Sequence, residues 1–213
     1  MKKTLCLLFA LVWAMAAFSQ TGAEIIDRMN ERINSRAGDG ISLIVDVKVP
    51  VLGAIATKTA VLGEKRRLDV KMKEHNVITF SEKDTIWIYT EETNSIIISN
   101  DSVMAQSKSS NQGGMNVDIF GDLTEGYDIT IKNQNLVKWE LACKRKKSNK
   151  DDDSPKNMTL EVRKETYEPI SMSTKMMGIN CTMHDFKFGL SEKEVTFNEA
   201  DFPGVTIVDN RQP

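Results

Sequence analysis

The chain has 213 residues, of which 40% are hydrophobic, and a formal net charge of −2. A length of this order suits one folded domain. The basic residues are scattered along the sequence rather than gathered into one segment, so we expect no nucleic-acid partner.

The first segment, MKKTLCLLFALVWAMAAFSQ, has the layout of a secretory signal peptide. Two lysines precede an apolar stretch over 5–17, and small residues follow it. We predict that residues 1–19 are removed, leaving a soluble secreted domain over 20–213. Loss of Lys2 and Lys3 changes the net charge from −2 to −4. Cys6 lies at the start of the apolar stretch rather than at its end, which argues against lipid attachment.

One amphipathic helix comes first, over 23–35. Ile25, Ile26, Met29 and Ile33 recur at helical spacing with charged residues opposite. From residue 41 the hydrophobic period changes to two, and it predicts strands over 41–49, 57–73, 76–81, 85–90 and 94–99. The short polar turns between them imply an antiparallel meander.

Arg66 occupies an unusual place in the strand predicted over 57–73. If the strand is unbroken, Arg66 lies on its apolar side while Arg67 faces solvent. A guanidinium in an apolar wall needs several acceptors, so Arg66 is a candidate latch. A bulge at Gly63, or a rim position with the charged head in water, is the alternative. The apolar residues that share the parity of Arg66 are Ala60, Leu62, Leu68, Val70 and Met72.

The strand pattern stops between residues 100 and 125, where Ser, Asn, Gln and Gly dominate. A loop of this length inside a compact domain is unusual and tends to be functional or disordered. We predict a lid of one or two short helices across an opening. Its sparse apolar residues are Val103, Met104, Met115, Val117, Ile119, Phe120 and Leu123.

Strands are predicted again over 127–133, 136–146, 156–165, 168–177 and 180–189, with an exposed charged loop, KRKKSNKDDDSP, between the second and third. Asp151, Asp152 and Asp153 are consecutive and lack the alternating spacing of a calcium loop, so we predict no metal site. The fold class is mainly β (α+β): a large, curved antiparallel sheet whose concave apolar face is covered by the first helix and by segment 100–125.

The sequence offers little support for catalysis. Neither a nucleophile elbow nor a metal-ligand cluster occurs, and nothing local supports a dyad of Cys143 and His184. We therefore expect neither an enzyme nor a cofactor. Cys143 and Cys181 remain after signal removal, either bridged or as two free buried thiols.

Four segments in order resemble a known family. They are 65–72 (KRRLDVKM), with an arginine followed by Val70 and Met72; 84–98 (DTIWIYTEETNSIII); 167–190; and the tail 197–211 (FNEADFPGVTIVDNR). Behind a signal peptide, this arrangement resembles the LolA family of periplasmic lipoprotein carriers. Arg67 stands where the family usually has proline.

The resemblance implies an unclosed barrel whose helical lid covers a hydrophobic cavity for acyl chains, with Arg66 as the latch between lid and barrel. It also implies a monomer that receives cargo from an inner-membrane release complex and delivers it to an outer-membrane acceptor. An envelope sensor of the RseB type, or a non-catalytic binding module with a filled core, is the alternative. Methionine suits surfaces that adapt to variable chains, although it also fills ordinary cores. The predicted ligand-binding residues are Val47, Val49, Leu68, Val70, Met72, Met104, Phe120, Leu123, Trp139, Leu141, Met158, Leu160, Met172, Met176, Phe186 and Phe188.

Overall fold

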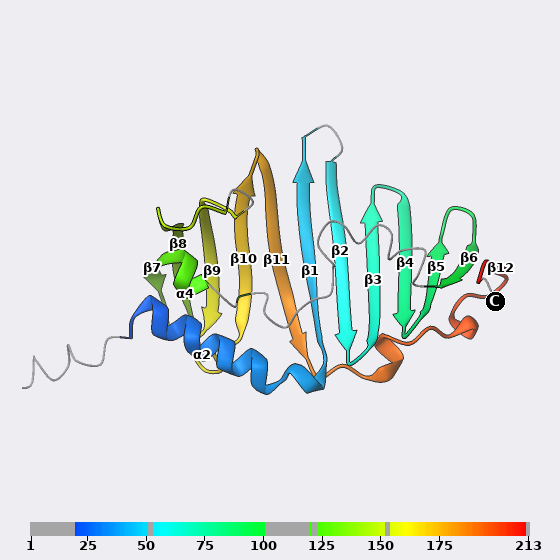
Figure 1. Cartoon of the computed structure of the whole chain (residues 1–213), viewed down its shortest axis with the longest axis horizontal. Coiled ribbons are helices and arrows are strands. Elements are labelled where there is room, and N and C mark those ends of the chain that lie inside the picture. The colour runs from blue at the N-terminus through cyan, green and yellow to red at the C-terminus, as the bar shows by residue number, and fades with distance from the viewer. Residues whose placement is uncertain (1–19, 51–52, 101–119, 121–122, 152–153, 212–213) are drawn as a thin grey trace, which may run out of the picture.

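The computed structural model describes residues 20–50, 53–100, 120, 123–151 and 154–211 (Figure 1). Its helices are α2 (Gly22–Ser35) and α4 (Leu123–Gly126), and its short 3-10 turns are η1 (Ala37–Asp39), η2 (Glu192–Glu194) and η3 (Glu199–Asp201). Its strands are β1 (Ile41–Val49), β2 (Gly53–Leu62), β3 (Lys65–Met72), β4 (His75–Glu82), β5 (Thr85–Thr90), β6 (Ser95–Asn100), β7 (Tyr127–Gln134), β8 (Lys138–Arg145), β9 (Asn157–Arg163), β10 (Pro169–Met176), β11 (Ile179–Phe188) and β12 (Thr206–Asp209).

All of these strands form one twelve-stranded sheet in the order β12-β6-β5-β4-β3-β2-β1-β11-β10-β9-β8-β7. Neighbouring strands are antiparallel except β12, which runs parallel to β6. Strands β7 and β12 form the two edges, so within the described residues the sheet is not closed into a barrel. The expected large unclosed sheet with one main helix is confirmed. Strand β12 was not predicted, because its four residues are all exposed and carry no alternation of burial.

Helix α2 forms where the sequence predicted a helix and begins with a capping box. The Glu24 backbone N–H donates to the Thr21 hydroxyl at 3.2 Å, and the Thr21 N–H donates to the Glu24 carboxylate at 2.9 Å. These two bonds satisfy backbone donors that the first helical turn leaves free. The apolar side of the helix, Ile25, Ile26, Met29 and Ile33, is buried.

The single strand predicted over 57–73 is wrong, because the chain reverses at Gly63 and Glu64 and forms β2 and β3. Gly63 has a φ of 58°, which glycine adopts without the steric cost that other residues meet. Leu62 therefore pairs with Lys65, and Ala60 pairs with Arg67. Ala60 and Leu62 lie on the face of Arg67 rather than on that of Arg66.

Cross-strand pairs define two faces of the sheet, since directly paired residues point to the same side. One face, here called the helix face, runs through Leu141, Leu160, Met172, Met183, Val45 and Val70. Helix α2 packs on it over β7 to β9 and the adjoining strands. The other face, here called the tail face, runs through Ser42, Ala60, Arg67, Phe80 and Trp87.

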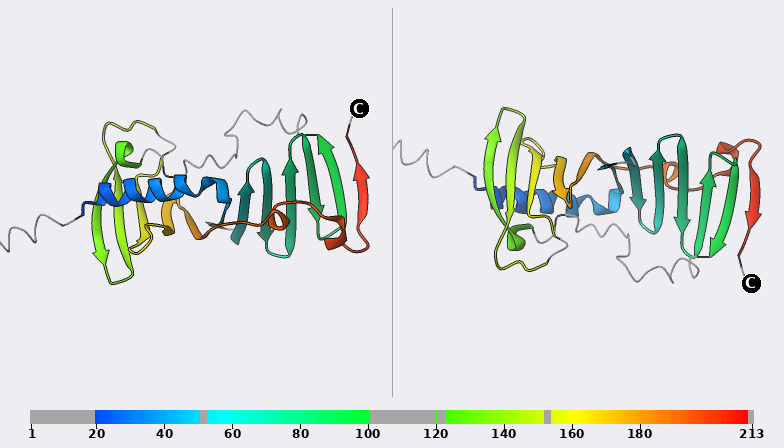
Figure 2. Two further views of the ribbon diagram at one scale, coloured as in Figure 1. Left: turned by 90° about the horizontal axis from the view of Figure 1, so that it is seen from below. Right: turned by 90° about the horizontal axis from the view of Figure 1, so that it is seen from above.

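The tail segment, residues 189–205, crosses the tail face of β3 to β5. Phe197 stacks on Trp87 with ring centroids 5.4 Å apart and meets Phe80 edge-on at 5.8 Å. Phe202 lies against Tyr89 at 4.6 Å and against Phe197 at 5.8 Å. Figure 2 shows α2 along one half of the sheet and the tail segment along the other. The two halves are thus covered on opposite faces.

Residues 1–19, where we predicted the signal peptide, and most of the predicted lid lie outside the described residues. Of the apolar lid residues, Phe120 and Leu123 are described, and both are buried in the core beneath α2. Met104 lies outside the described residues. Within the described ranges, the helices are too short and too polar to cross a membrane.

Candidate functional site

The predicted ligand-binding residues on the strands all share the helix face. The register links Leu141, Leu160 and Met172 to one another, and through Met183 it continues across the sheet to Val70. Residues two positions along each strand point the same way. The set on this face is Val47, Val49, Leu68, Val70, Met72, Trp139, Leu141, Met158, Leu160, Met172, Met176, Phe186 and Phe188.

The half of the helix face under α2 is a filled core. Leu141 and Leu160 are 0% exposed, and Trp139 and Met158 are also buried. Phe186 of β11 packs against this core, and its ring centroid lies 5.8 Å from that of Phe120. An acyl chain can reach these side chains only if α2 or residue 120 moves away from the sheet.

The other half of the helix face is apolar and partly exposed. Leu68 is 37% exposed and Ile97 is 39% exposed. Their apolar neighbours pair directly across the strands, Val70 with Val77 and Ile88 with Ile97. We call this surface the apolar patch, and its residues are Val45, Val47, Ile55, Leu68, Val70, Met72, Val77, Ile88, Ile97 and Met183. The patch adjoins the core and lies on the part of the helix face that α2 does not cover.

Arg66 lies at one end of this patch, paired with Val61 on β2 and with Ser81 on β4. Its side chain is exposed and makes no hydrogen bond or ion pair with any described residue. This placement agrees with the alternative of a rim arginine whose charged head is in water. The latch role concerns the lid, most of which lies outside the described residues, so it stays a prediction.

Arg67, expected to face solvent, is instead half-buried on the tail face. Its Nε donates to Asp69 Oδ1 at 2.7 Å and its second amino group donates to Oδ2 at 3.0 Å. Its guanidinium also lies 5.2 Å from the centre of the Phe80 ring. The tail segment covers this face of the sheet through the contact of Phe197 with Phe80, which strand alternation could not reveal. A small cavity of about 30 Å³ adjoins it, lined by Ser42, Lys58, Ala60, Arg67, Asp69 and Glu194.

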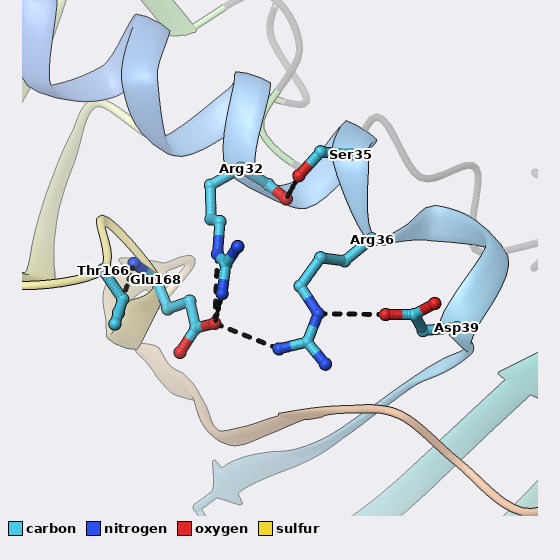
Figure 3. A network of polar contacts seen from close by, with 6 residues as sticks. All are labelled: Arg32, Ser35, Arg36, Asp39, Thr166 and Glu168. Atoms are coloured by element: carbon cyan, nitrogen blue, oxygen red, sulfur yellow. Dashed lines mark hydrogen bonds and ion pairs between the residues drawn. The ribbon is translucent and has the colours of Figure 1, made fainter.

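Two other arginines tie α2 to the sheet (Figure 3). Arg32 donates twice to Glu168 Oε1, at 3.0 and 3.2 Å, and Arg36 donates to the same oxygen at 3.3 Å. Arg36 Nε also donates to Asp39 at 3.1 Å. Glu168 precedes β10, so this network holds the C-terminal end of the helix to the β9–β10 turn. We call it the helix tether.

Arg28 extends the tether along the helix. It donates to the Tyr167 hydroxyl at 3.0 Å, and its guanidinium lies 5.3 Å from the centre of that ring. The sequence reasoning missed these residues. The signal was present in the spacing of Arg28, Arg32 and Arg36 at every fourth position, which aligns them on one side of a helix.

The cysteines are free thiols rather than a disulfide. Cys143 is on β8 and Cys181 is on β11, with β9 and β10 between them, so three strand spacings of about 14 Å separate them. A disulfide requires Cα atoms within about 7 Å. Burial raises the pKa of the Cys143 thiol to about 11 and also raises the pKa of Cys181. Neither is therefore an activated nucleophile.

The histidines form ordinary polar pairs. His184 lies on the tail-face side of β11, where its Nε2 is 3.0 Å from Asp46 Oδ2, whereas Cys143 lies in the core on the helix face. His75 pairs with Glu92 at 2.9 Å. A dyad of Cys143 and His184 is excluded by this geometry. Among the described residues, histidine, cysteine and carboxylate side chains form no cluster of three suited to a metal ion.

No protein-family model and no curated protein matches this chain. Among solved structures, LprF from Mycobacterium bovis aligns with 81% of this chain and 96% of its own, at 10% identity and a TM-score of 0.52. The Mycobacterium tuberculosis lipoprotein LppX aligns with 78% of this chain and 96% of its own, at 11% identity and a TM-score of 0.51.

A LolA superfamily protein from Nitrosomonas europaea also aligns, over 84% of this chain and 99% of its own, at 12% identity. Its TM-score is 0.32. The likeness to LprF and LppX concerns the fold alone. The unclosed twelve-stranded sheet and its packed N-terminal helix agree with the architecture that the family resemblance implied. The protein shares the fold of LprF and LppX.

Proposed function

We propose that the apolar patch binds acyl chains of lipids or lipoproteins. The observation that carries this proposal is the partial exposure of the patch, in which Leu68 and Ile97 are more than one third exposed on a face that continues the core. Contiguous apolar surface of this kind marks an interaction site in soluble proteins. Four residues predicted from the sequence as ligand contacts belong to this patch, which supports the proposal: Val47, Leu68, Val70 and Met72.

The driving force for such binding is large enough to matter. Burying one methylene group contributes about 0.8 kcal/mol, so ten methylenes contribute roughly 8 kcal/mol when fully buried. An acyl chain lying on the patch would bury only part of its surface, because the patch is open. Displacement of α2 would add the side chains of the filled core, and the helix tether sets the cost of that displacement.

The wider role that we propose is that of a periplasmic carrier without catalytic activity. It would take up acylated cargo at the inner membrane from a release complex and hand it to an outer-membrane acceptor. This role extends the acyl-binding proposal and follows the family resemblance of the sequence.

Titration with a fluorescent fatty-acid probe tests the proposal, together with native mass spectrometry for lipids that copurify. We expect saturable probe binding that Leu68→Gln weakens several-fold. Leu136→Gln is the matched control, because Leu136 is 97% exposed in the β7–β8 turn, outside the patch. The absence of both copurified lipid and saturable probe binding would overturn the proposal, as would equal effects of the two substitutions.

A further inference from the structure

Met177 is a large apolar side chain held in solvent. It is 92% exposed at the tip of the two-residue turn between β10 and β11, at the upper end of the sheet in Figure 1. Its φ of 49° and that of Gly178, 83°, place both turn residues in the left-handed region. Asparagine or glycine usually occupies the first of these positions, because other side chains are strained there. Fold stability therefore gives no reason for a methionine at this tip.

Three exposed lysines lie at the same end of the sheet as this tip, one in the hairpin itself and two on its β1 side along the strand order. Lys175 on β10 and Lys48 on β1 both pair with Asn180 of β11, so their Cα atoms are about 10 Å apart on the tail face. Lys73 directly follows β3 at the same end of the sheet. The three side chains are exposed, and none makes an ion pair with another described residue. The acidic residues at this end are Glu74, next to Lys73, and Glu91 and Glu92 in the β5–β6 turn, where Glu92 pairs with His75 at 2.9 Å. We call Met177 with these three lysines the upper rim.

The opposite end of the sheet provides a contrast. Leu136 is just as exposed there, but the nearby lysines are paired: Lys132 with Glu140 at 2.7 Å, and Lys138 with Glu161. Exposed apolar tips thus occur at both ends. The tip at the upper rim stands among lysines without an ion-pair partner in the described part of the chain, whereas Lys164, the third lysine near Leu136, donates to Gln134 at 3.0 Å and lies over the Trp139 ring.

We propose that the upper rim docks on an anionic lipid surface. Met177 enters the interfacial layer, and Lys48, Lys73 and Lys175 meet lipid phosphates. The chain as a whole is acidic, with a net charge of −2, so the attraction must come from this local group. Each lysine near an anionic membrane contributes attraction that salt screens within a Debye length. This inference rests on its own observations and adds a membrane contact to the proposed acyl binding.

The shape of the rim favours a lipid surface over a protein partner. A single methionine at a narrow turn buries little area against another protein, whereas stable protein interfaces bury about 800 Å² on each side. The same side chain reaches below lipid head groups, where it meets apolar surroundings on every side. On the helix face, Met176, Val49 and Met72 lead from this end of the sheet into the apolar patch, so docking would bring the patch to the membrane.

Co-sedimentation with vesicles tests the proposal. We expect the protein to bind vesicles of equal parts phosphatidylglycerol and phosphatidylcholine at low ionic strength, to bind pure phosphatidylcholine weakly, and to dissociate at high salt. The double substitution Lys48→Gln with Lys175→Gln should lower the partition coefficient about 30-fold, at about fivefold for each lysine. Met177→Ser should lower it about tenfold.

Matched controls remove the same charge and the same kind of side chain elsewhere. Lys132→Gln with Lys193→Gln, and separately Leu136→Ser, should leave vesicle binding unchanged. All rim variants should keep the parent's circular dichroism and fatty-acid probe binding, which separates this inference from the proposed function. Three outcomes would overturn the docking proposal. They are equal binding to both vesicle types, control effects as large as those at the rim, and no binding at all. In the last case an acidic protein surface becomes the occupant to test.

Discussion

Arg66 and Arg67 are adjacent in sequence, and they lie in opposite surroundings because successive side chains of β3 point to opposite faces of the sheet. The face of Arg66 carries the apolar patch and is open at this position, so the guanidinium is exposed. The face of Arg67 is covered by the tail segment. Arg67 is held there by two bonds to Asp69 and by the Phe80 ring.

The first prediction concerns the stability of these two arginine variants. Arg67→Leu should lower the free energy of unfolding by about 1–2 kcal/mol, because it removes a bidentate charge-assisted contact and a cation–π contact that are partly shielded from water. Arg66→Leu should leave it within about 0.5 kcal/mol, as expected for an exposed substitution. Urea unfolding followed by tryptophan fluorescence measures both. A larger loss for Arg66→Leu would contradict this assignment of the two faces.

The second prediction is the latch. If Arg66 holds the lid through hydrogen bonds, Arg66→Leu should change the rates at which a fluorescent fatty acid is taken up and released, while the fold survives. A few bonds of about 0.5–3 kcal/mol each would be lost. Stopped-flow mixing gives both rates, and Arg66→Lys is the control that keeps the charge. Rates equal to those of the parent would show that Arg66 is not the latch.

At the scale of elements, the tail segment covers β3 to β5, the part of the sheet on which α2 does not pack. Three aromatic residues of the tail face, Phe80, Trp87 and Tyr89, meet Phe197 and Phe202. These contacts join a segment without long regular structure to β4 and β5. Aromatic pairs of this geometry contribute about 0.5–1.5 kcal/mol beyond the area that they bury.

The third prediction is that Phe197→Ala destabilises the fold by about 2–4 kcal/mol, because it removes the ring that contacts Phe80, Trp87 and Phe202 together. Val208→Ala on the exposed strand β12 is the comparison, with an expected change below about 0.5 kcal/mol. Denaturant titration checks both, and the Trp87 emission should shift to longer wavelength in Phe197→Ala. Similar stabilities for the two variants would show that the tail contributes little.

The fourth prediction concerns pH and the cap of η2. The Ser191 backbone N–H donates to the Glu194 carboxylate at 2.8 Å and the Ser191 hydroxyl donates at 2.9 Å, which lowers the pKa of Glu194 below its usual 4.5. A lowered carboxyl pKa gives stability that is present above the unfolded-state pKa and is lost as pH falls through the folded-state pKa.

Ser191→Ala removes the hydroxyl donor and keeps the backbone donor, so it should make the loss of stability below pH 4.5 shallower without changing its sign. Thermal unfolding of the parent and of Ser191→Ala, from near-neutral pH to below 4.5, measures the slope. Glu194→Gln should remove the contribution of this group altogether. An unchanged slope in both variants would mean that other carboxyls dominate the acid transition.

On the scale of the whole molecule, the sheet is covered on opposite faces in its two halves. The half under α2 contains the filled core around Leu141 and Leu160, and the half under the tail segment leaves its helix face partly exposed. The edge strands β7 and β12 end the hydrogen-bonded array on either side. Local stability should therefore differ along the sheet.

The fifth prediction follows from this unequal cover. In hydrogen exchange, the amides of β8 and β9 should be the most protected, because both strands pair with an antiparallel neighbour on each side and are covered by α2. The amides of β12 should exchange fastest among the strands, since this short, exposed edge strand pairs only with β6. Mass-spectrometric exchange of peptic peptides measures the order. Protection of β12 equal to that of β9 would contradict it.

Much of this architecture was predictable from local pattern. The helical spacing of Ile25 to Ile33 and the period of two from residue 41 onward are determined by the sequence, because each depends only on neighbours within a few residues. The same alternation placed the predicted ligand-binding residues on one face. It failed at Gly63, where one reversal of the chain moved Ala60 and Leu62 to the other face, and at β12, which has no burial pattern to detect.

The sequence by itself determined the class of the fold, the extent of most strands and the apolar face that we propose for acyl chains. Tertiary structure alone decided which half of that face is filled by α2, that the tail segment covers the opposite face near Arg67, and that Glu168 joins Arg32 and Arg36. It also brought Lys48, Lys73 and Lys175 to one rim with Met177. The physical reason is the same throughout: side-chain periodicity is local, whereas cover, tethering and charge clustering depend on contacts between segments more than a hundred residues apart.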